Sequence, residues 1–259
     1  GEELAADEPE GNARGKRKAH QLRTHRRPGA GLPRGRARDD HRVLGQAILP
    51  ATGFLELGLA AGREALGHVP DLRDVTIMES LRFEGDETRL VQVLVRPDGQ
   101  GSARFEVFST RGDACGETTP GDWRRHAEGQ LVPGSATLPA AELLEAVRAR
   151  CGESISAVAH QAALAARGLA FGPSLHGVRA LRAGLGEALG EIVLPEPGVA
   201  GRGDYVLHPA LLDACMQVMN AAMTDAEGHD ITAGRAYLPF AIDKLQRVRA
   251  PRGLVWSHA

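Results

Sequence analysis

The sequence has few of the residues that cross-link a protein. Its three cysteines, Cys115, Cys151 and Cys215, are odd in number and lie far apart in a chain of 259 residues. Small disulfide-linked domains and structural zinc sites need paired or closely spaced cysteines, so the sequence predicts neither. Isolated cysteines are typical of a reducing compartment, and we expect a cytoplasmic protein.

Long apolar runs and a strong net charge are also missing. No stretch approaches the roughly 18 apolar residues of a membrane-spanning helix, and the first thirty residues are polar, so neither a membrane span nor a signal peptide is predicted. A net charge of −2 implies no general attraction to nucleic acid or to an anionic membrane. The content of 42% apolar and 25% charged residues is ordinary for a soluble globular protein with one large domain or two smaller ones.

Residues 1–40 differ from the rest of the chain. The segment 12–38 carries ten lysines and arginines, no acidic residue, and only Leu22 and Leu32 as aliphatic residues larger than alanine. Such a composition buries too little apolar surface to offset the entropy of ordering, so we expect a disordered basic tail. A nucleic-acid-binding arm is the alternative, disfavoured because no aromatic residue alternates with the charges.

Two strongly apolar helices are predicted in the rest of the chain. Residues 53–66 have only three polar exceptions, a pattern typical of a helix that other elements surround. Gly67 and Pro70 end this helix. The second helix covers 209–223, is again mostly apolar, and begins at Pro209, a residue that suits a first helical turn.

Strand patterns accompany both helices. They lie at 74–83, 90–95, 104–108 and 123–132 in the first half, and at 178–182, 187–194 and 253–257 in the second. Further helices are expected at 140–150 and 156–167. The sequence therefore predicts an α+β fold in which an antiparallel sheet wraps a helix twice: a first unit over 41–134, a linker over 135–152 and a second unit over 153–259. Nothing strand-like precedes His41 and few strand patterns follow the second helix, so both units are expected to be incomplete.

An acid and a base stand out, one in each half. Asp213 and Gln217 are four residues apart, so they share one face of the second helix and can form a hydrogen bond. An aspartate within an apolar helix is costly unless it is paired or protonated, and burial raises its pKa. His41 lies just ahead of the first helix. Alone each residue is unremarkable, but together they suggest a base and an acid that face each other across a shared cleft.

Four motifs resemble those of polyketide synthase dehydratase domains. His41-x-x-x-Gly45-x-x-x-x-Pro50 resembles the HxxxGxxxxP motif of that family, and His208-Pro-Ala-Leu-Leu-Asp213-x-x-x-Gln217 is similar to its HPALLDxxxQ motif. Residues 168–173 resemble GYxYGP, with Leu169 and Phe171 in place of the two tyrosines, and residues 238–240 match LPF. The motifs occur in the family's order over about 41–259.

The resemblance implies a double hotdog fold, two helix-in-sheet units in one chain, with His41 and Asp213 as the catalytic pair. Supporting or substrate-positioning residues, on the same basis, are Gln217, Gly45, Pro50, Gly172, Pro173, Phe171, His208, Leu238 and Pro239. We expect His208 to position the turn before its helix rather than to act in catalysis.

The reaction implied by the resemblance is loss of water from a β-hydroxyacyl thioester. A neutral histidine suits removal of the Cα proton, and a protonated aspartate suits donation to the departing hydroxyl group. The thioester oxygen needs backbone N–H donors, either near Gly172 or at the start of the second helix. No metal or soluble cofactor is expected, because the substrate arrives on the phosphopantetheine of an acyl carrier protein. Neighbouring synthase domains and a second copy of the chain are the other expected partners; nucleic acid and membrane are not.

Two other functions fit the same residues. A related double-hotdog cyclase or double-bond isomerase would use the same pair of residues. A catalytically decayed domain would serve only as a scaffold.

Overall fold

The computed structural model describes residues 39–85, 88–112, 123–134, 142–196, 202–223, 231–232, 234–251 and 253–259. Most of the predicted basic tail therefore lies outside the described residues. Asp39 and Asp40, which the sequence assigns to that tail, form a turn that leads into the first strand.

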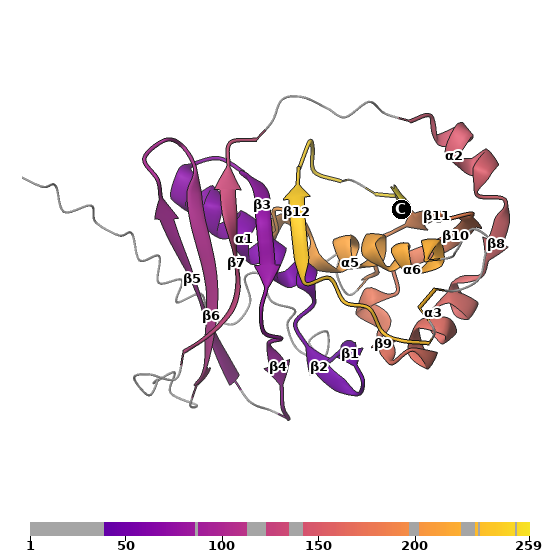
Figure 1. Ribbon diagram of the computed structural model, residues 1–259, viewed down its shortest axis with the longest axis horizontal. Coiled ribbons are helices and arrows are strands. Elements are labelled where there is room, and N and C mark those ends of the chain that lie inside the picture. The colour runs from indigo at the N-terminus through magenta and orange to yellow at the C-terminus, as the bar shows by residue number, and fades with distance from the viewer. Residues whose placement is uncertain are drawn as a thin grey trace, which may run out of the picture.

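The first predicted helix packs against a five-stranded antiparallel sheet (Figure 1). Helix α1 (Ala51–Leu66) starts two residues earlier than predicted and ends at Gly67, whose φ of 76° is the left-handed conformation that favours glycine. The sheet has the strand order β12-β3-β7-β6-β5. Its strands are β12 (Ala241–Leu245), β3 (Asp71–Ile77), β7 (Arg124–Val132), β6 (Ala103–Gly112) and β5 (Thr88–Pro97).

Close approach of the helix to this sheet depends on two glycines. A Cβ atom at Gly58 would lie 2.9 Å from Phe105 Cζ, and one at Gly129 would lie 2.7 Å from Phe105 Cε1. The Phe105 ring is fully buried between them with Phe54 and Leu59 of α1. Packing, rather than backbone flexibility, explains why these positions are glycine.

The second unit repeats this arrangement with a smaller sheet. Its strand order is β13-β11-β10-β8, from β13 (Val255–His258), β11 (Glu187–Ile192), β10 (Val178–Gly184) and β8 (Glu153–Ile155). The predicted helix over 209–223 is two helices, α5 (Pro209–Gln217) and α6 (Met219–Ala222), which pack on this sheet. They meet at Val218, where bonds from Val218 N to Cys215 O and from Ala221 N to Val218 O tighten the turn.

A third sheet joins the two halves of the chain. It has the order β4-β2-β1-β9, from β4 (Arg82–Phe83), β2 (Gln46–Ile48), β1 (His41–Val43) and β9 (Leu169–Phe171). Strand β9 thus brings the second half to the first, and β12 does the same where it pairs with β3. In addition, α5 contacts α1. The two predicted units are therefore held together by shared sheets as well as by helix packing.

The prediction of one strand over 74–83 is wrong, because the chain leaves the sheet after Ile77. The carbonyl oxygen of His126 accepts hydrogen bonds from Met78 N and Glu79 N, which turns the chain away. The segment then forms β4, which pairs with β2 instead.

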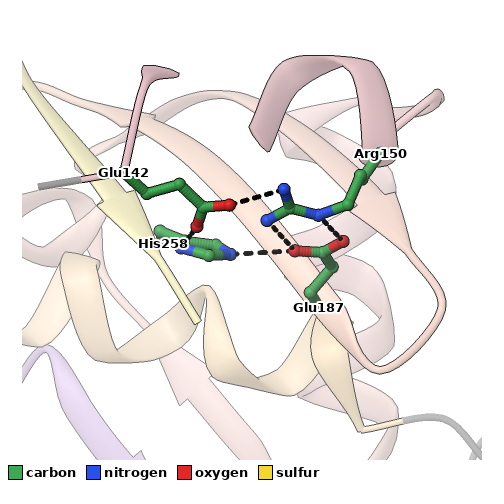
Figure 2. A network of polar contacts seen from close by, with 4 residues as sticks. All are labelled: Glu142, Arg150, Glu187 and His258. Carbon is green, nitrogen blue, oxygen red and sulfur yellow. Dashed lines mark hydrogen bonds and ion pairs between the residues drawn. The ribbon is translucent and has the colours of Figure 1, made fainter. Parts of the chain in front are cut away.

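The predicted linker is tied to the second sheet by an ion-pair network (Figure 2). Helix α2 (Leu144–Arg150) ends in Arg150, whose guanidinium donates to both carboxylate oxygens of Glu187 on β11, at 2.7 and 3.0 Å. Arg150 also pairs with Glu142, and His258 on β13 lies 3.0 Å from Glu187. These bonds lower the pKa of Glu187 to about 2. Helix α3 (Ala157–Ala166) follows, capped by the Ser156 hydroxyl, which accepts from Ala159 N.

Candidate active site

His41 is placed by the tight hairpin between β1 and β2. Its two turn residues, Leu44 and Gly45, both have positive φ angles, 48° and 81°, as a two-residue hairpin turn of this kind requires. Gly45 therefore shapes the turn that places His41. His41 is buried, pairs with Phe171 across β1 and β9, and its ring centroid lies 5.3 Å from the Phe171 ring centroid.

Asp40 anchors His41 to the Gly172–Pro173 turn, a role that no sequence motif predicts. Its carbonyl oxygen accepts from Gly172 N at 2.7 Å, and its carboxylate accepts from Ser174 N at 2.8 Å. A Cβ atom on residue 172 would lie 2.1 Å from Asp40 Oδ1, so only glycine admits this carboxylate. Pro173 begins the short 3₁₀ helix η2 (Pro173–Leu175) that the Asp40 carboxylate caps. The only sequence signal was an acidic residue directly before His41, at the end of the basic segment.

Asp213 lies on α5 and is held by Gln217, as their spacing predicts. Gln217 Nε2 donates to Asp213 Oδ2 at 2.9 Å and to the carbonyl oxygen of Leu175 at 3.1 Å. Gln161 on α3 donates in turn to Gln217 Oε1 at 3.0 Å. The orientation of Asp213 is thus fixed from α3 and η2 as well as from its own helix. Gln161 was missed because nothing local in the sequence links it to the second helix.

His208 caps the helix that carries Asp213. Its Nδ1 accepts from Ala210 N at 3.2 Å, and its carbonyl oxygen accepts from the N–H groups of Leu211 and Leu212. Its ring also meets the Tyr205 ring edge-on, with centroids 4.5 Å apart. His208 thus positions the start of α5, whose fifth residue is Asp213.

The remaining predicted residues have different places in the fold. Pro50 is the buried residue before the first turn of α1. Leu238 is half exposed and Pro239 partly buried in the segment that leads to β12, where Phe240 O accepts from Ile77 N. No described contact brings either residue to His41 or Asp213.

His41 and Asp213 influence each other's protonation across the two halves. Burial lowers the pKa of His41, and the Asp213 carboxylate partly offsets this effect. Burial raises the pKa of Asp213, while His41 and the hydrogen bond from Gln217 oppose the increase. Within the described residues, His41 Nδ1 is buried without a hydrogen-bond partner. The site thus favours a neutral imidazole beside a carboxyl group that can hold a proton.

Both backbone candidates for holding a thioester oxygen already have partners. Gly172 N donates to Asp40 O, and Ala210 N donates to the His208 side chain. The next two N–H groups of α5 donate to His208 O. Neither the Gly172 turn nor the start of α5 therefore offers an unshared donor.

Comparisons with known proteins identify the family. A family model described as "Polyketide synthase dehydratase domain" matches residues 37–110, and "Polyketide synthase dehydratase N-terminal domain" matches 139–259. The dehydratase domain from the CurK module of curacin polyketide synthase superposes with a TM-score of 0.75 at 34% identity, over 85% of this chain and 75% of that one. This chain belongs to the polyketide synthase dehydratase family.

Curated synthases carry the same type of domain. The chain is 36% identical over 207 residues to polyketide synthase GfsB of Streptomyces halstedii, and 36% identical over 206 residues to the spectinabilin polyketide synthase system protein NorB of Streptomyces orinoci. Each match covers 78% of this chain, but they span only 4% and 9% of those synthases. The fold and the reaction class of the dehydratase family are thereby confirmed: a double hotdog, and a hydro-lyase of polyketide biosynthesis.

Two classes of feature are missing from the part of this dehydratase that the structure describes. There, no group of three or more His, Cys, Asp or Glu side chains is arranged to hold a metal ion. No helix in the same part is long and apolar enough to cross a membrane.

The buried His160, next to Gln161 on α3, should make the dehydratase fold sensitive to acid. The His160 side chain is 4% exposed, and burial lowers its pKa from 6.5 to about 4. Between these two pH values the unfolded chain binds the proton more readily, so stability is lost as the pH falls. We expect His160→Leu to remove about 3 kcal/mol of this acid destabilisation. Urea unfolding at pH 7 and pH 4 measures it, with the exposed Val158→Ala on the same helix as control. Parallel pH curves for wild type and His160→Leu would contradict the prediction.

Proposed function

We propose that this chain removes water from a β-hydroxyacyl thioester carried on the phosphopantetheine of an acyl carrier protein, with His41 as base and Asp213 as acid. The observation that carries the proposal is that one turn, Gly172–Leu175, is hydrogen-bonded both to Asp40, which precedes the buried His41, and to Gln217, which holds the buried Asp213. Each group is shifted toward the protonation state that its role requires: a neutral imidazole and a protonated carboxyl.

The reaction balances with these two residues alone. His41 takes a proton from Cα, the electron pair of that C–H bond forms the Cα–Cβ double bond, and the Cβ–O bond breaks. Asp213 donates its proton to the departing hydroxyl group, which leaves as water. Gln217 occupies Asp213 Oδ2, which leaves Oδ1 to carry the proton, and burial keeps the His41 imidazole neutral, so that it can accept one. Return of the proton from His41 to Asp213 resets the site.

Two solved relatives support this assignment of roles. They are inactive mutants of the CurK dehydratase, one with a histidine replaced by phenylalanine and the other with an aspartate replaced by asparagine. They are 32% and 33% identical to this chain, with TM-scores of 0.72 and 0.73. One histidine and one aspartate are also the residues that the motifs pick out here, at positions 41 and 213.

The proposal extends to partners and location. The curated relatives are polyketide synthases, so we propose that the chain works beside other synthase domains, receives its substrate from an acyl carrier protein and pairs with a second copy of itself. The reaction needs no metal or soluble cofactor, because both proton transfers are made by side chains. A cytoplasmic location is part of the same proposal.

Incubation with β-hydroxyacyl pantetheine thioesters of several chain lengths and both β-configurations tests the function. We expect an α,β-unsaturated thioester, detected by mass spectrometry as the loss of one water. Failure to form it from any of these substrates would reject dehydration and favour a scaffold role. Conversion of an unsaturated thioester to one with a shifted or cyclised chain, without loss of water, would instead favour an isomerase or cyclase.

A further inference from the structure

Glu56 is a buried carboxylate that the proposed reaction does not use. It lies on α1, is 1% exposed, and is among the largest fully buried side chains of the described residues. Its two oxygens accept hydrogen bonds from two consecutive backbone N–H groups in the other half of the chain: Oε1 from Val206 at 2.9 Å and Oε2 from Leu207 at 2.8 Å. Both bonds link residues about 150 positions apart, so Glu56 connects the two halves directly.

The residues that Glu56 holds lie immediately before the helix that carries Asp213. Leu207 is followed by His208, the cap of α5, and Asp213 is the fifth residue of that helix. Val206 and Leu207 pack against the core of the first unit, whose α1 follows the hairpin that carries His41. Glu56 therefore links the helix that follows the hairpin of His41 to the segment that precedes the helix of Asp213.

We propose that Glu56 is a positioning residue that sets the approach of Asp213 to His41 by fixing the backbone ahead of α5. A carboxylate suits this task because it accepts two hydrogen bonds in one plane and donates none. The inference rests on the proposed dehydration. Its structural part, the placement of Asp213 relative to His41, is measurable without turnover.

Opposing effects act on the charge of Glu56. Burial raises the pKa of Glu56 to about 7, while the two backbone N–H groups, Arg63 and Arg247 oppose the increase. A protonated carboxyl oxygen is a weaker acceptor than a carboxylate oxygen, so the bonds to Val206 and Leu207 are strongest in the carboxylate form.

Glu56→Gln tests the inference with almost no change in volume. The amide keeps one acceptor but sets an NH₂ group against a backbone N–H, so one bond is lost. We expect kcat for β-hydroxyacyl thioesters to fall about tenfold with KM unchanged, because misplacement of a reacting group acts on the chemical step rather than on substrate binding. The pKa of His41, followed by NMR, should fall further in the variant, since the Asp213 carboxylate that raises it would lie farther away.

Two control variants separate positioning from general stability. Glu64→Gln removes an exposed carboxylate from the same helix and should leave kcat and the His41 titration unchanged. Leu59→Ala weakens the core of α1 and should lower the unfolding temperature without lowering kcat of the folded protein.

Each outcome for Glu56→Gln decides the inference. Wild-type kcat in this variant, or a loss no larger than that of Leu59→Ala at matched folded fraction, would overturn it. If the wild-type protein itself forms no product, the proposed function fails, and the NMR titration of His41 alone decides whether Glu56 positions Asp213. An unchanged His41 pKa in Glu56→Gln would then reject the inference as well.

Discussion

Asp213→Asn should lower kcat for β-hydroxyacyl thioester dehydration by between about 10²- and 10⁴-fold, the range that a positioned general acid contributes. The substitution removes the transferable proton and little else. The new amide oxygen can still accept the hydrogen bond that Gln217 Nε2 gives to Asp213 Oδ2. The variant should therefore fold and bind substrate normally, with the loss confined to kcat.

His41→Phe should cause a loss of similar size by removal of the base. Phenylalanine retains the aromatic contact with Phe171 across the β1–β9 pair. Because the two groups act in one step, the double variant should be no slower than the slower single variant. Initial rates at saturating substrate measure all three, with the exposed Asp204→Asn as control. If the two single losses multiplied in the double variant, the paired mechanism would be wrong.

The same two residues set the expected pH dependence. Burial lowers the pKa of His41, so the base becomes competent below the usual titration range of histidine. Burial raises the pKa of Asp213, so the acid keeps its proton above the usual range of aspartate. A bell-shaped profile of kcat/KM with apparent pKa values that belong to the pair is expected. Asp213→Asn should remove the alkaline limb of this kcat/KM profile, because no acid remains to ionise.

Local patterns in the sequence, together with the resemblance to the family motifs, pointed to the proposed catalytic pair. The bond between Asp213 and Gln217 follows from helical spacing alone, and Pro209 marks the start of the helix that carries Asp213. Each feature depends only on residues a few positions apart. The apolar character of residues 53–66 likewise predicted that a sheet would surround the helix they form.

Features that depend on distant contacts could not be predicted in this way. The bend after Ile77 requires the carbonyl oxygen of His126, and the support of Gln217 requires Gln161 on another helix. The pairing of β12 with β3 joins a strand that precedes the second helix in the sequence to one that follows it. The role of Asp40 could not be predicted, because the composition of the basic segment before it argued against any ordered contact.

Gly172→Ala should reduce kcat/KM by about 10²-fold, the cost of a displacement of about 1 Å at a catalytic group. The backbone at Gly172 is extended, so alanine itself is not strained there. Its methyl group, however, would lie 2.1 Å from Asp40 Oδ1 and 2.8 Å from Asp40 Cβ. Asp40 would have to move, and the residue bonded to it is His41.

A second substitution separates this clash from a general loss of stability. Asp40→Gly in the Gly172→Ala background removes every Asp40 side-chain atom that the new methyl group would meet, and the Asp40 carbonyl can still accept from residue 172. It should restore part of the lost kcat/KM, even though the cap on Ser174 N is gone. Gly152→Ala, where a Cβ meets nothing within 4 Å, should behave as wild type. Full activity of Gly172→Ala, or no recovery in the double variant, would show that the close contact between Asp40 and Gly172 does not position His41.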